Sequence, residues 1–177
     1  DHNHRGWIWD TAADGGGSSM ERVSLALSNN NGQNWAASTT HSGTPGAANS
    51  TADANIAPLI RNVSQSPAVP SSTEIVTVTA RITDEATTGI TATLLYRIDG
   101  AAGFASKPIF DDGLHGDGAA GDGEYGATLN PAAGGDFSRA LTNLDVIEYY
   151  VRAADAAANV RTWPAPAQLG PNVVGHW

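Results

Sequence analysis

Residues 75–82 read Ile-Val-Thr-Val-Thr-Ala-Arg-Ile, and this stretch decides the fold class. Apolar and polar side chains alternate along it with a period of two, as in a β-strand that has one face in a hydrophobic core. Residues 91–98, TATLLYRI, and residues 145–153, DVIEYYVRA, are two further strand candidates. In the last of them Ile147, Tyr149 and Val151 share one face. We therefore expect an all-β protein.

Turn-forming residues interrupt the chain every eight to twelve positions or so, which is the spacing of an all-β sandwich. Pro67 and Pro70 lie between the strand candidates at 59–63 and 75–82. Proline ends strand pairing, so its position there agrees with a break between two strands. The remaining candidates are residues 59–63, 104–110, 123–129 and 160–163. Together with the first three they make seven strands, so we expect an immunoglobulin-like or fibronectin III-like sandwich over residues 58–165.

The rest of the chain divides into three pieces. Residues 1–50 are rich in glycine and too short for a full core, but they hold strand candidates at 6–9 and 19–25. We expect this part to be a short β-rich remnant that packs on its neighbour. Residues 51–57 are small and polar, as in a linker, and residues 166–177 form a C-terminal tail.

Composition limits the function. Eighteen acidic and nine basic residues give a net charge of −9, and no Lys/Arg cluster occurs, so we expect no nucleic-acid partner. No apolar run approaches the length needed for membrane insertion. The absence of cysteine excludes a disulfide framework and a thiolate metal site. A low Lys/Arg content with abundant Ala, Thr, Ser, Asn and Gly favours a secreted or cell-surface protein.

The most distinctive segment is residues 111–126, DDGLHGDGAAGDGEYG. Asp-Gly recurs in it every five residues, and each glycine lets the chain turn through positive φ just after a carboxylate. Such turns would direct several oxygens to one point, and calcium accepts six to eight oxygens in flexible geometry. The expected metal ligands are Asp112, Asp117 and Asp122, which precede glycines, together with Asp111 and Glu124.

Two alternatives limit this interpretation. The segment could be a solvated surface loop, because Asp-Gly is common in turns. Magnesium ranks behind calcium, because it demands stricter octahedral geometry. We expect His115 to pack or to form hydrogen bonds rather than to bind the ion.

A second acidic group comprises Asp84 and Glu85, which follow a strand, and Asp155 with Asn159 in a later turn. The turns at one end of a sandwich lie together, so this group could bind a metal ion. An Asx-type turn at Asp155 is the favoured interpretation.

The chain start offers a third group, His2 and His4 with Asp1 and Asp10. A His-x-His pair on a strand would suit zinc, but no third well-spaced ligand follows, so we expect no metal there.

Tryptophans offer a different function. Trp7 and Trp9 lie on the same face of a strand and could, with Trp35 or Trp163, stack against sugar rings. Such pairs are more often packing residues.

The sequence has neither a G-x-S-x-G serine elbow nor an H-E-x-x-H zinc motif, and the loop carboxylates are too close and exposed for acid–base chemistry. We therefore expect no enzyme activity.

Two segments carry a family resemblance. The elements Gly17–Arg22, Gly32–Ser38 and Gly43–Asn49 (GTPGAAN) resemble the C-terminal end of bacterial lamin-tail domains over residues 6–50. The second segment runs from Pro58 to Asp155 and includes the acidic loop. It is similar to the β-sandwich modules that follow lamin-tail domains in large exported proteins of planctomycetes and related bacteria.

This resemblance implies a non-catalytic module of a multidomain cell-surface or matrix protein. From residues and resemblance together we expect a calcium-stabilised structural or adhesive module, supporting neighbouring domains of its own chain and contacting surface polysaccharide or protein. The alternative is a carbohydrate-binding module of a polysaccharide-degrading enzyme that uses Trp7, Trp9 and Trp35.

Overall fold

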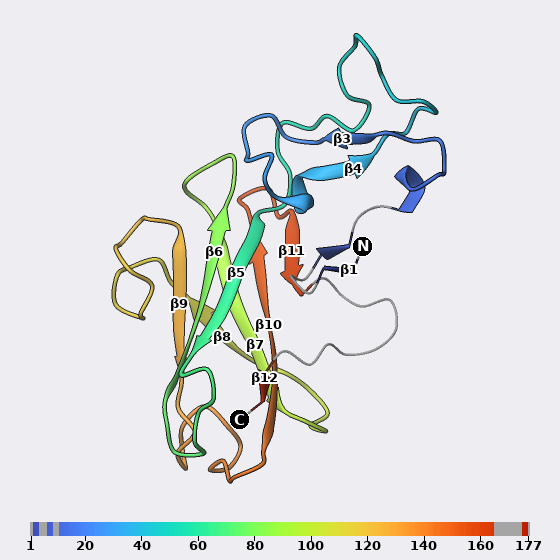
Figure 1. Ribbon diagram of the computed structural model, residues 1–177. Coiled ribbons are helices and arrows are strands. Elements are labelled where there is room, and N and C mark those ends of the chain that lie inside the picture. Colours follow the sequence, from blue (N-terminus) through green and yellow to red (C-terminus); the bar gives the residue numbers. More distant parts are fainter. Residues whose placement is uncertain (1, 4–6, 9–10, 165–174, 177) are drawn as a thin grey trace.

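A computed structural model describes residues 2–3, 7–8, 11–164 and 175–176. Seven strands form two antiparallel sheets packed face to face (Figure 1), in the orders β5-β6-β9 and β11-β10-β7-β8. The predicted seven-stranded sandwich is confirmed, and β7 and β11 begin and end at the expected residues. The bounds are β5 (Leu59–Ser66), β6 (Val76–Thr83), β7 (Thr91–Ile98), β8 (Ala105–Ile109), β9 (Glu124–Leu129), β10 (Val146–Ala154) and β11 (Val160–Trp163).

The core lies between the sheets and follows the predicted alternation. Along β6, every second side chain is buried, from Val76 to Ile82. From the opposite sheet, Leu94 of β7 and Val151 of β10 are fully buried in the same cluster. Each fully buried aliphatic side chain of this kind stabilises the fold by about 1.5–3 kcal/mol.

The two sheets are joined along one edge by a bridge between Phe110 and Gly126. The N–H of Phe110 donates to the carbonyl of Gly126 at 3.0 Å, and the N–H of Gly126 donates back at 2.7 Å. The acidic loop therefore leaves and re-enters the sandwich at one bridge, which pins both of its ends.

The N-terminal part forms short paired strands beside the sandwich (Figure 1). β1 pairs with β2 and β3 pairs with β4, and of the strand predicted at 19–25 only Met20–Arg22 is a strand. Within the range expected to be a tail, β12 pairs with β10. The bounds are β1 (His2–Asn3), β2 (Trp7–Ile8), η1 (Thr11–Ala13), β3 (Met20–Arg22), η2 (Gly32–Asn34), β4 (Trp35–Ala37) and β12 (Gly175–His176).

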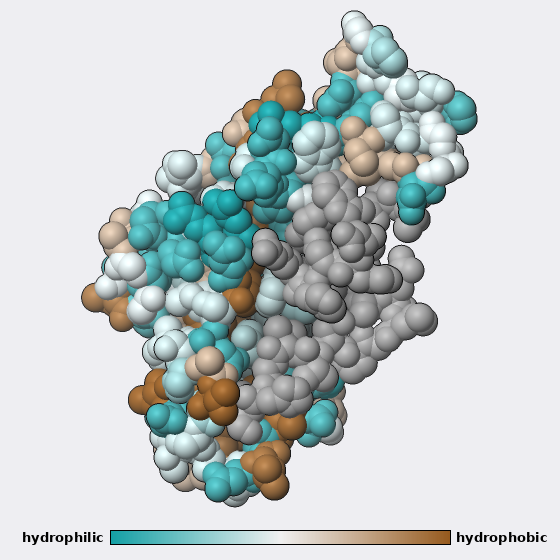
Figure 2. All heavy atoms as spheres, viewed as in Figure 1, coloured by the Kyte–Doolittle hydropathy of each residue, from teal (hydrophilic) through white to brown (hydrophobic). Residues whose placement is uncertain are grey.

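The face of the molecule in Figure 2 is mostly hydrophilic, with hydrophobic residues in small separate groups. The large apolar side chains that are exposed include Val69, Leu114 and Leu144. Single exposed apolar residues are normal on a soluble surface and need no partner. Among the residues that the structure describes, no helix is long and apolar enough to span a membrane.

Candidate functional site

The acidic loop lies at the end of the sandwich that carries the N-terminal segment (Figure 1). β6 ends at Thr83, β9 begins at Glu124 and β10 ends at Ala154, so three loops gather there. These are residues 84–90, 110–123 and 155–159. The linker enters β5 at the same end.

Asp117 is the centre of the acidic loop and is fully buried. Its Oδ2 accepts the N–H groups of Asp112 at 2.7 Å and Gly113 at 2.9 Å, and its Oδ1 accepts the N–H of His115 at 3.1 Å. Burial raises the pKa of this carboxyl, but these backbone donors outweigh burial and hold the pKa below its ordinary value. Asp117 therefore holds one half of the loop together as an anion.

Asp111 plays the same part for the other half of the loop. Its Oδ1 accepts the N–H groups of Gly121 at 2.8 Å and Asp122 at 3.1 Å, and its Oδ2 accepts the N–H of Gly123 at 2.9 Å. Three successive backbone N–H groups thus surround one carboxylate, which is the arrangement of an anion-binding nest. The anion in this nest is the carboxylate of Asp111, a residue of the loop itself.

Asp122 and Asp112 cap shorter turns. Asp122 accepts the N–H groups of Ala119 at 3.0 Å and Glu124 at 2.8 Å, and these bonds lower its pKa. Asp112 accepts the N–H of Leu114 at 3.0 Å and contacts Nδ1 of His115 at 2.9 Å. His115 also lies against the ring of Phe110, so the prediction that it packs and forms hydrogen bonds is confirmed.

Glu124, the fifth predicted ligand, differs from the other four. It is the first residue of β9, and burial raises its pKa. The structure therefore brings four of the five predicted residues into one network of carboxylates and backbone amides, with Glu124 at its edge.

Two glycines are required by close approaches around this network. A Cβ on Gly126 would lie 2.4 Å from the carbonyl oxygen of His115, and a Cβ on Gly118 would lie 2.8 Å from Oδ2 of Asp122. Gly118 also has a φ of +92°, which other residues rarely adopt. The loop could not close in this form with larger residues at these positions.

The fit of the loop to a metal ion is limited. Over the described part of the chain, no three Asp, Glu, His or Cys side chains come together in a way that could hold a metal ion. In the loop, the carboxylates of Asp111, Asp117 and Asp122 each accept N–H groups through both oxygens. Calcium binding would require several of these oxygens to exchange or share their partners. Calcium ligation here stays a prediction.

The second predicted acidic group lies at the junction of linker and sandwich. Asp155 accepts the backbone N–H and the side-chain amide of Asn159, both at 2.8 Å, and the side-chain amide of Asn55 at 2.9 Å. The turn expected at Asp155 is thus confirmed. Its bond to Asn55 also ties the linker to the loop after β10.

Asp84 and Glu85 are less well satisfied. Glu85 accepts the N–H of Ile56 in the linker at 3.4 Å through Oε1, whereas its Oε2 is buried without a hydrogen-bond partner. Both carboxylate oxygens of Asp84 are buried and lack a partner among the described residues. Burial, and then the neighbouring Glu85, raise the pKa of Asp84. Such groups call for an explanation, because buried polar atoms are nearly always paired.

Two adjoining hollows lie between the loop after β6 and the acidic loop. The smaller, of about 210 Å³, is lined by Asp84 and Arg81 among others, and the larger measures about 520 Å³. Tyr125 and Asp111 line both hollows. This region, which we call the loop groove, was not identified from the sequence, since only the fold brings its residues together.

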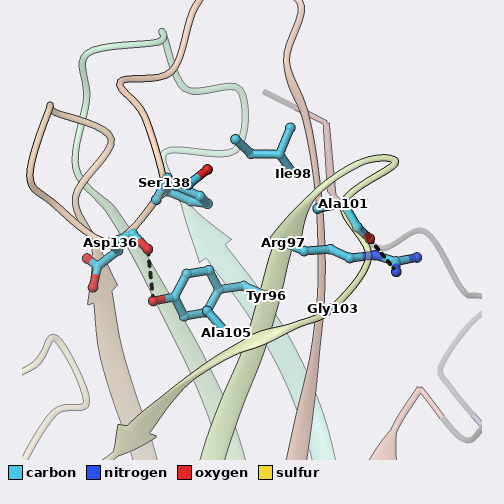
Figure 3. A pocket seen from close by; sticks show the side chains of 9 residues that line it. Tyr96, Arg97, Ile98, Ala101, Gly103, Ala105, Asp136 and Ser138 are labelled. Atoms are coloured by element: carbon cyan, nitrogen blue, oxygen red, sulfur yellow. Dashed lines mark hydrogen bonds between the residues drawn. The ribbon is translucent and has the colours of Figure 1, made fainter.

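A third hollow, of about 190 Å³, lies at the opposite end of the sandwich (Figure 3). The hydroxyl of Tyr96 donates to the carbonyl of Asp136 at 3.2 Å beside it, and Arg97 donates to the carbonyl of Ala101 at 3.0 Å. Arg97 also pairs with the buried Glu148 and lies 4.4 Å from the ring centroid of Phe104. These groups bind one another and leave few free donors or acceptors for a ligand.

Of the predicted sugar-stacking tryptophans, the structure describes the side chains of Trp35 and Trp163. Trp35 is half-buried and its indole N–H donates to the carbonyl of Asn29 at 2.9 Å. Trp163 packs against the core. Trp7 lies in β2 and its side chain is not described, while Trp9 lies outside the described residues.

The histidine group at the chain start, where we expect no metal, also lies mostly outside the described residues. His4, Asp1 and Asp10 lie outside the described residues, and His2 lies in β1 without a described side chain.

Sequence reasoning missed the polar residues that organise the N-terminal segment. Buried Asn34 accepts the N–H of Ser24 at 2.7 Å and donates to the carbonyl of Ser24 at 2.8 Å. Buried Glu21 accepts the hydroxyls of Thr44 at 2.6 Å and Ser50 at 2.7 Å. A charged residue inside a predicted strand, followed by a Ser/Thr-rich segment, was the available signal.

The comparison with protein families fits this architecture. Residues 71–143 match the family model described as "Conditioned medium factor 2nd Ig-like domain". The match covers less than half of the chain and extends from just before β6 to just before β10, so it includes the whole acidic loop. No curated protein matches the chain. The sandwich is thus an immunoglobulin-like fold, and the structure extends it beyond the matched residues by β5, β10 and β11.

Proposed function

We propose that the chain is a non-catalytic, immunoglobulin-like structural or adhesive module of a secreted or cell-surface protein. Immunoglobulin-like domains typically act as supports or contact modules, and the family match of the sandwich supports this role. On this proposal the N-terminal segment, which resembles the end of a lamin-tail domain, and the sandwich act as one rigid support. The low Lys/Arg content and the acidic surface favour a place outside the cell.

The observation that carries the proposal is the direct joining of the N-terminal segment to the first strand of the sandwich. The side-chain amide of Gln33 donates to the carbonyl of Ile60 at 2.7 Å and accepts its N–H at 2.8 Å. Because Ile60 is almost fully buried, its two backbone groups need these bonds as partners.

The linker is fixed by further polar contacts. Arg161 of β11 donates to the carbonyls of Pro58 at 2.8 Å and Ala57 at 3.2 Å. Asn55 binds Asp155, and the N–H of Asp53 donates to the carbonyl of Val23 at 3.1 Å. A segment that reads as a flexible linker is therefore bonded on both sides, as a spacer of fixed geometry requires.

Hydrogen exchange tests the structural part of this proposal. We expect the amides of Asp53, Ile56 and Ile60 to exchange much more slowly than those of the exposed residues 102–103. Exchange of all three at the rate of an unstructured peptide would contradict a rigid support. Fractionation of the native host, with detection of the chain in the medium or at the surface, tests the localisation.

Calcium stabilisation of the acidic loop is a separate part of the proposal. The acidic composition of the loop and the affinity of calcium for carboxylate oxygens support it. Melting curves in calcium and in a chelator test it, with Asp122→Asn as the loop variant. A rise in Tm with calcium that the variant removes would support ligation. Identical curves would mean that amide bonds alone hold the loop.

A further inference from the structure

Asp84 and Glu85, which directly follow β6, leave three buried oxygens without a donor. Both carboxylate oxygens of Asp84 and Oε2 of Glu85 have no hydrogen-bond partner in the described part of the chain. The two carboxyl groups contact each other, yet neither can donate when both are ionised. One proton held between them would supply the missing donor, as in other pairs of close carboxyl groups.

The surroundings of the pair place this proton on Asp84. Burial, and then the contact with Glu85, raise the pKa of Asp84, and the negative charge of Asp155 adds to this effect. The N–H of Ala86 acts in the opposite direction, but it does not form a hydrogen bond of normal geometry and does not outweigh burial. Glu85, in contrast, accepts the N–H of Ile56 and interacts with the positive charge of Arg161. Glu85 is therefore the member of the pair that carries the charge.

Further charged or titratable groups line the smaller hollow beside Asp84, namely Arg81 of β6, Asp111 and Asp122 of the acidic loop, and Tyr125 of β9. Burial raises the pKa of Tyr125, so its hydroxyl stays neutral in the range in which carboxyl groups titrate. Hydrogen bonds from the N–H groups of Ala119 and Glu124 lower the pKa of Asp122, which therefore ionises before Asp84 as the pH rises. The negative charge of Asp122 is thus already present when Asp84 loses its proton.

The pair lies against the linker that joins the N-terminal segment to the sandwich. Oε1 of Glu85 holds the N–H of Ile56 at 3.4 Å. Loss of the shared proton would leave two negative charges in contact in a buried site, where they repel each other strongly. Residues 86–89 of the same loop are exposed, so outward movement of this loop would let both carboxylates reach water. Such movement takes Glu85 away from the linker.

We propose that Asp84 and Glu85 share one proton and form a pH-sensitive latch, which holds the linker to the sandwich in acid and loosens as the pH rises. The latch is fully closed below the ordinary carboxyl pKa of about 3.9 and is lost as the pH rises through the raised pKa of Asp84. The bonds between Gln33 and Ile60 contain no titratable group, so this second tie stays closed. The proposal rests on the rigid joint of the proposed function and supplies its regulation.

Hydrogen exchange of the whole chain, followed by NMR at a series of pH values from about 4 to 7, tests the latch. After correction for the intrinsic exchange rate, the protection of the Ile56 amide should fall about tenfold for each unit by which the pKa of Asp84 is raised. The protection of the Ile60 amide should stay constant. Asp84→Asn should remove the fall at Ile56, because its amide donates to Glu85 at every pH. Asp99→Asn, at an exposed position, is the matched control and should keep the fall.

Carboxyl NMR shifts over the same pH series give a second, direct reading of the pair. Asp84 should titrate above the ordinary aspartate range, and Asp84→Asn should change the titration of Glu85. An Asp84 that titrates near a pH of about 3.9, or a fall at Ile56 that folded Asp84→Asn retains, would overturn the proposal. Fast exchange of Ile60 at every pH would reject the rigid joint and the latch with it, whereas a constant Ile56 beside a slowly exchanging Ile60 would reject the latch alone.

Discussion

Gln33 and Ile60 are joined by a pair of hydrogen bonds in which a side-chain amide takes the place of a neighbouring strand. Gln33 Nε2 donates to Ile60 O at 2.7 Å, and Ile60 N–H donates to Gln33 Oε1 at 2.8 Å. These two backbone groups of β5 are therefore satisfied by the N-terminal segment rather than by β6. The sandwich in isolation would leave both groups without this partner, so the two parts should unfold together.

Replacing Gln33 tests this dependence. Gln33→Ala should lower the free energy of unfolding by about 1–3 kcal/mol, because two buried backbone groups lose their partners. Asn30→Ala, in an exposed part of the same segment, is the control and should change stability little. Urea unfolding followed by circular dichroism measures both. A separate first transition for the N-terminal segment in the wild type would contradict joint unfolding.

The acidic loop leads to a prediction at Asp117. Asp117→Asn places an NH₂ group against backbone N–H donors in a fully buried position, and should destabilise the protein by about 1–3 kcal/mol. Since the donors are backbone amides, the loss should appear in chelator as well as in calcium. Asp99→Asn, an exposed residue at the opposite end, is the matched control. A loss seen only with calcium would instead assign Asp117 to a metal site.

Gly126 tests how tightly the loop closes on β9. Gly126→Ala puts a methyl group 2.4 Å from the carbonyl oxygen of His115, so the backbone must move. We expect a loss of about 1–3 kcal/mol, as for other overpacked sites. Gly103→Ala meets no atom within 4 Å and should be close to neutral. Equal thermal stability of the two variants would show that the loop is looser than the bridge between Phe110 and Gly126 implies.

Arg97 and Glu148 form a buried ion pair that spans β7 and β10. Arg97→Met should cost about 3–5 kcal/mol, because Glu148 is only 2% exposed and would be left without its partner. The double variant Arg97→Met, Glu148→Leu should recover much of this loss, since apolar pairs often replace buried ion pairs without cost. A double variant as unstable as Arg97→Met alone would mean that the lost guanidinium packing over Phe104 dominates.

The strands could be predicted from the sequence because apolar and polar side chains alternate along them. Val76 and Val78 of β6 face the core, while Thr77 and Thr79 between them do not, and no distant residue is needed to see this. The turn-forming residues between these segments then indicated how many strands to expect. The N-terminal strands were predicted less well, because Met20–Arg22 is held by distant partners of Glu21 rather than by a pattern of its own.

The acidic loop was located from the sequence, but its hydrogen bonding was not. Repeated Asp-Gly shows where carboxylates and turns occur, yet it does not show whether an oxygen accepts an N–H group or faces an ion. That choice depends on backbone geometry, as at Asp111, which accepts amides ten to twelve residues away. The loop groove depends on contacts between loops far apart in sequence, so alternation and motif reasoning could not reveal it.

Stability should depend on pH in opposite directions at two aspartates. At Asp145, the hydrogen bonds from Arg139 and then from Thr142 hold the pKa well below its ordinary value. The ionised Asp145 therefore stabilises the fold fully above a pH of about 3.9. This stabilisation is lost as the pH falls through the folded-state pKa of Asp145. At Asp84, burial and Glu85 raise the folded-state pKa. Its stabilisation is therefore present below a pH of about 3.9 and lost as pH rises through that raised value.

Replacing Asp84 isolates its share of this dependence. Asp84→Asn should flatten the decline in stability as pH rises above about 3.9, and should raise the Tm at neutral pH, because an amide has no charge to desolvate. Urea unfolding at a series of pH values measures the slope, and Asp99→Asn serves as the control. The loss of stability in acid that Asp145 contributes should remain in the Asp84 variant. An unchanged slope above a pH of about 3.9 would show that Asp84 is ionised as easily in the folded protein as in the unfolded chain.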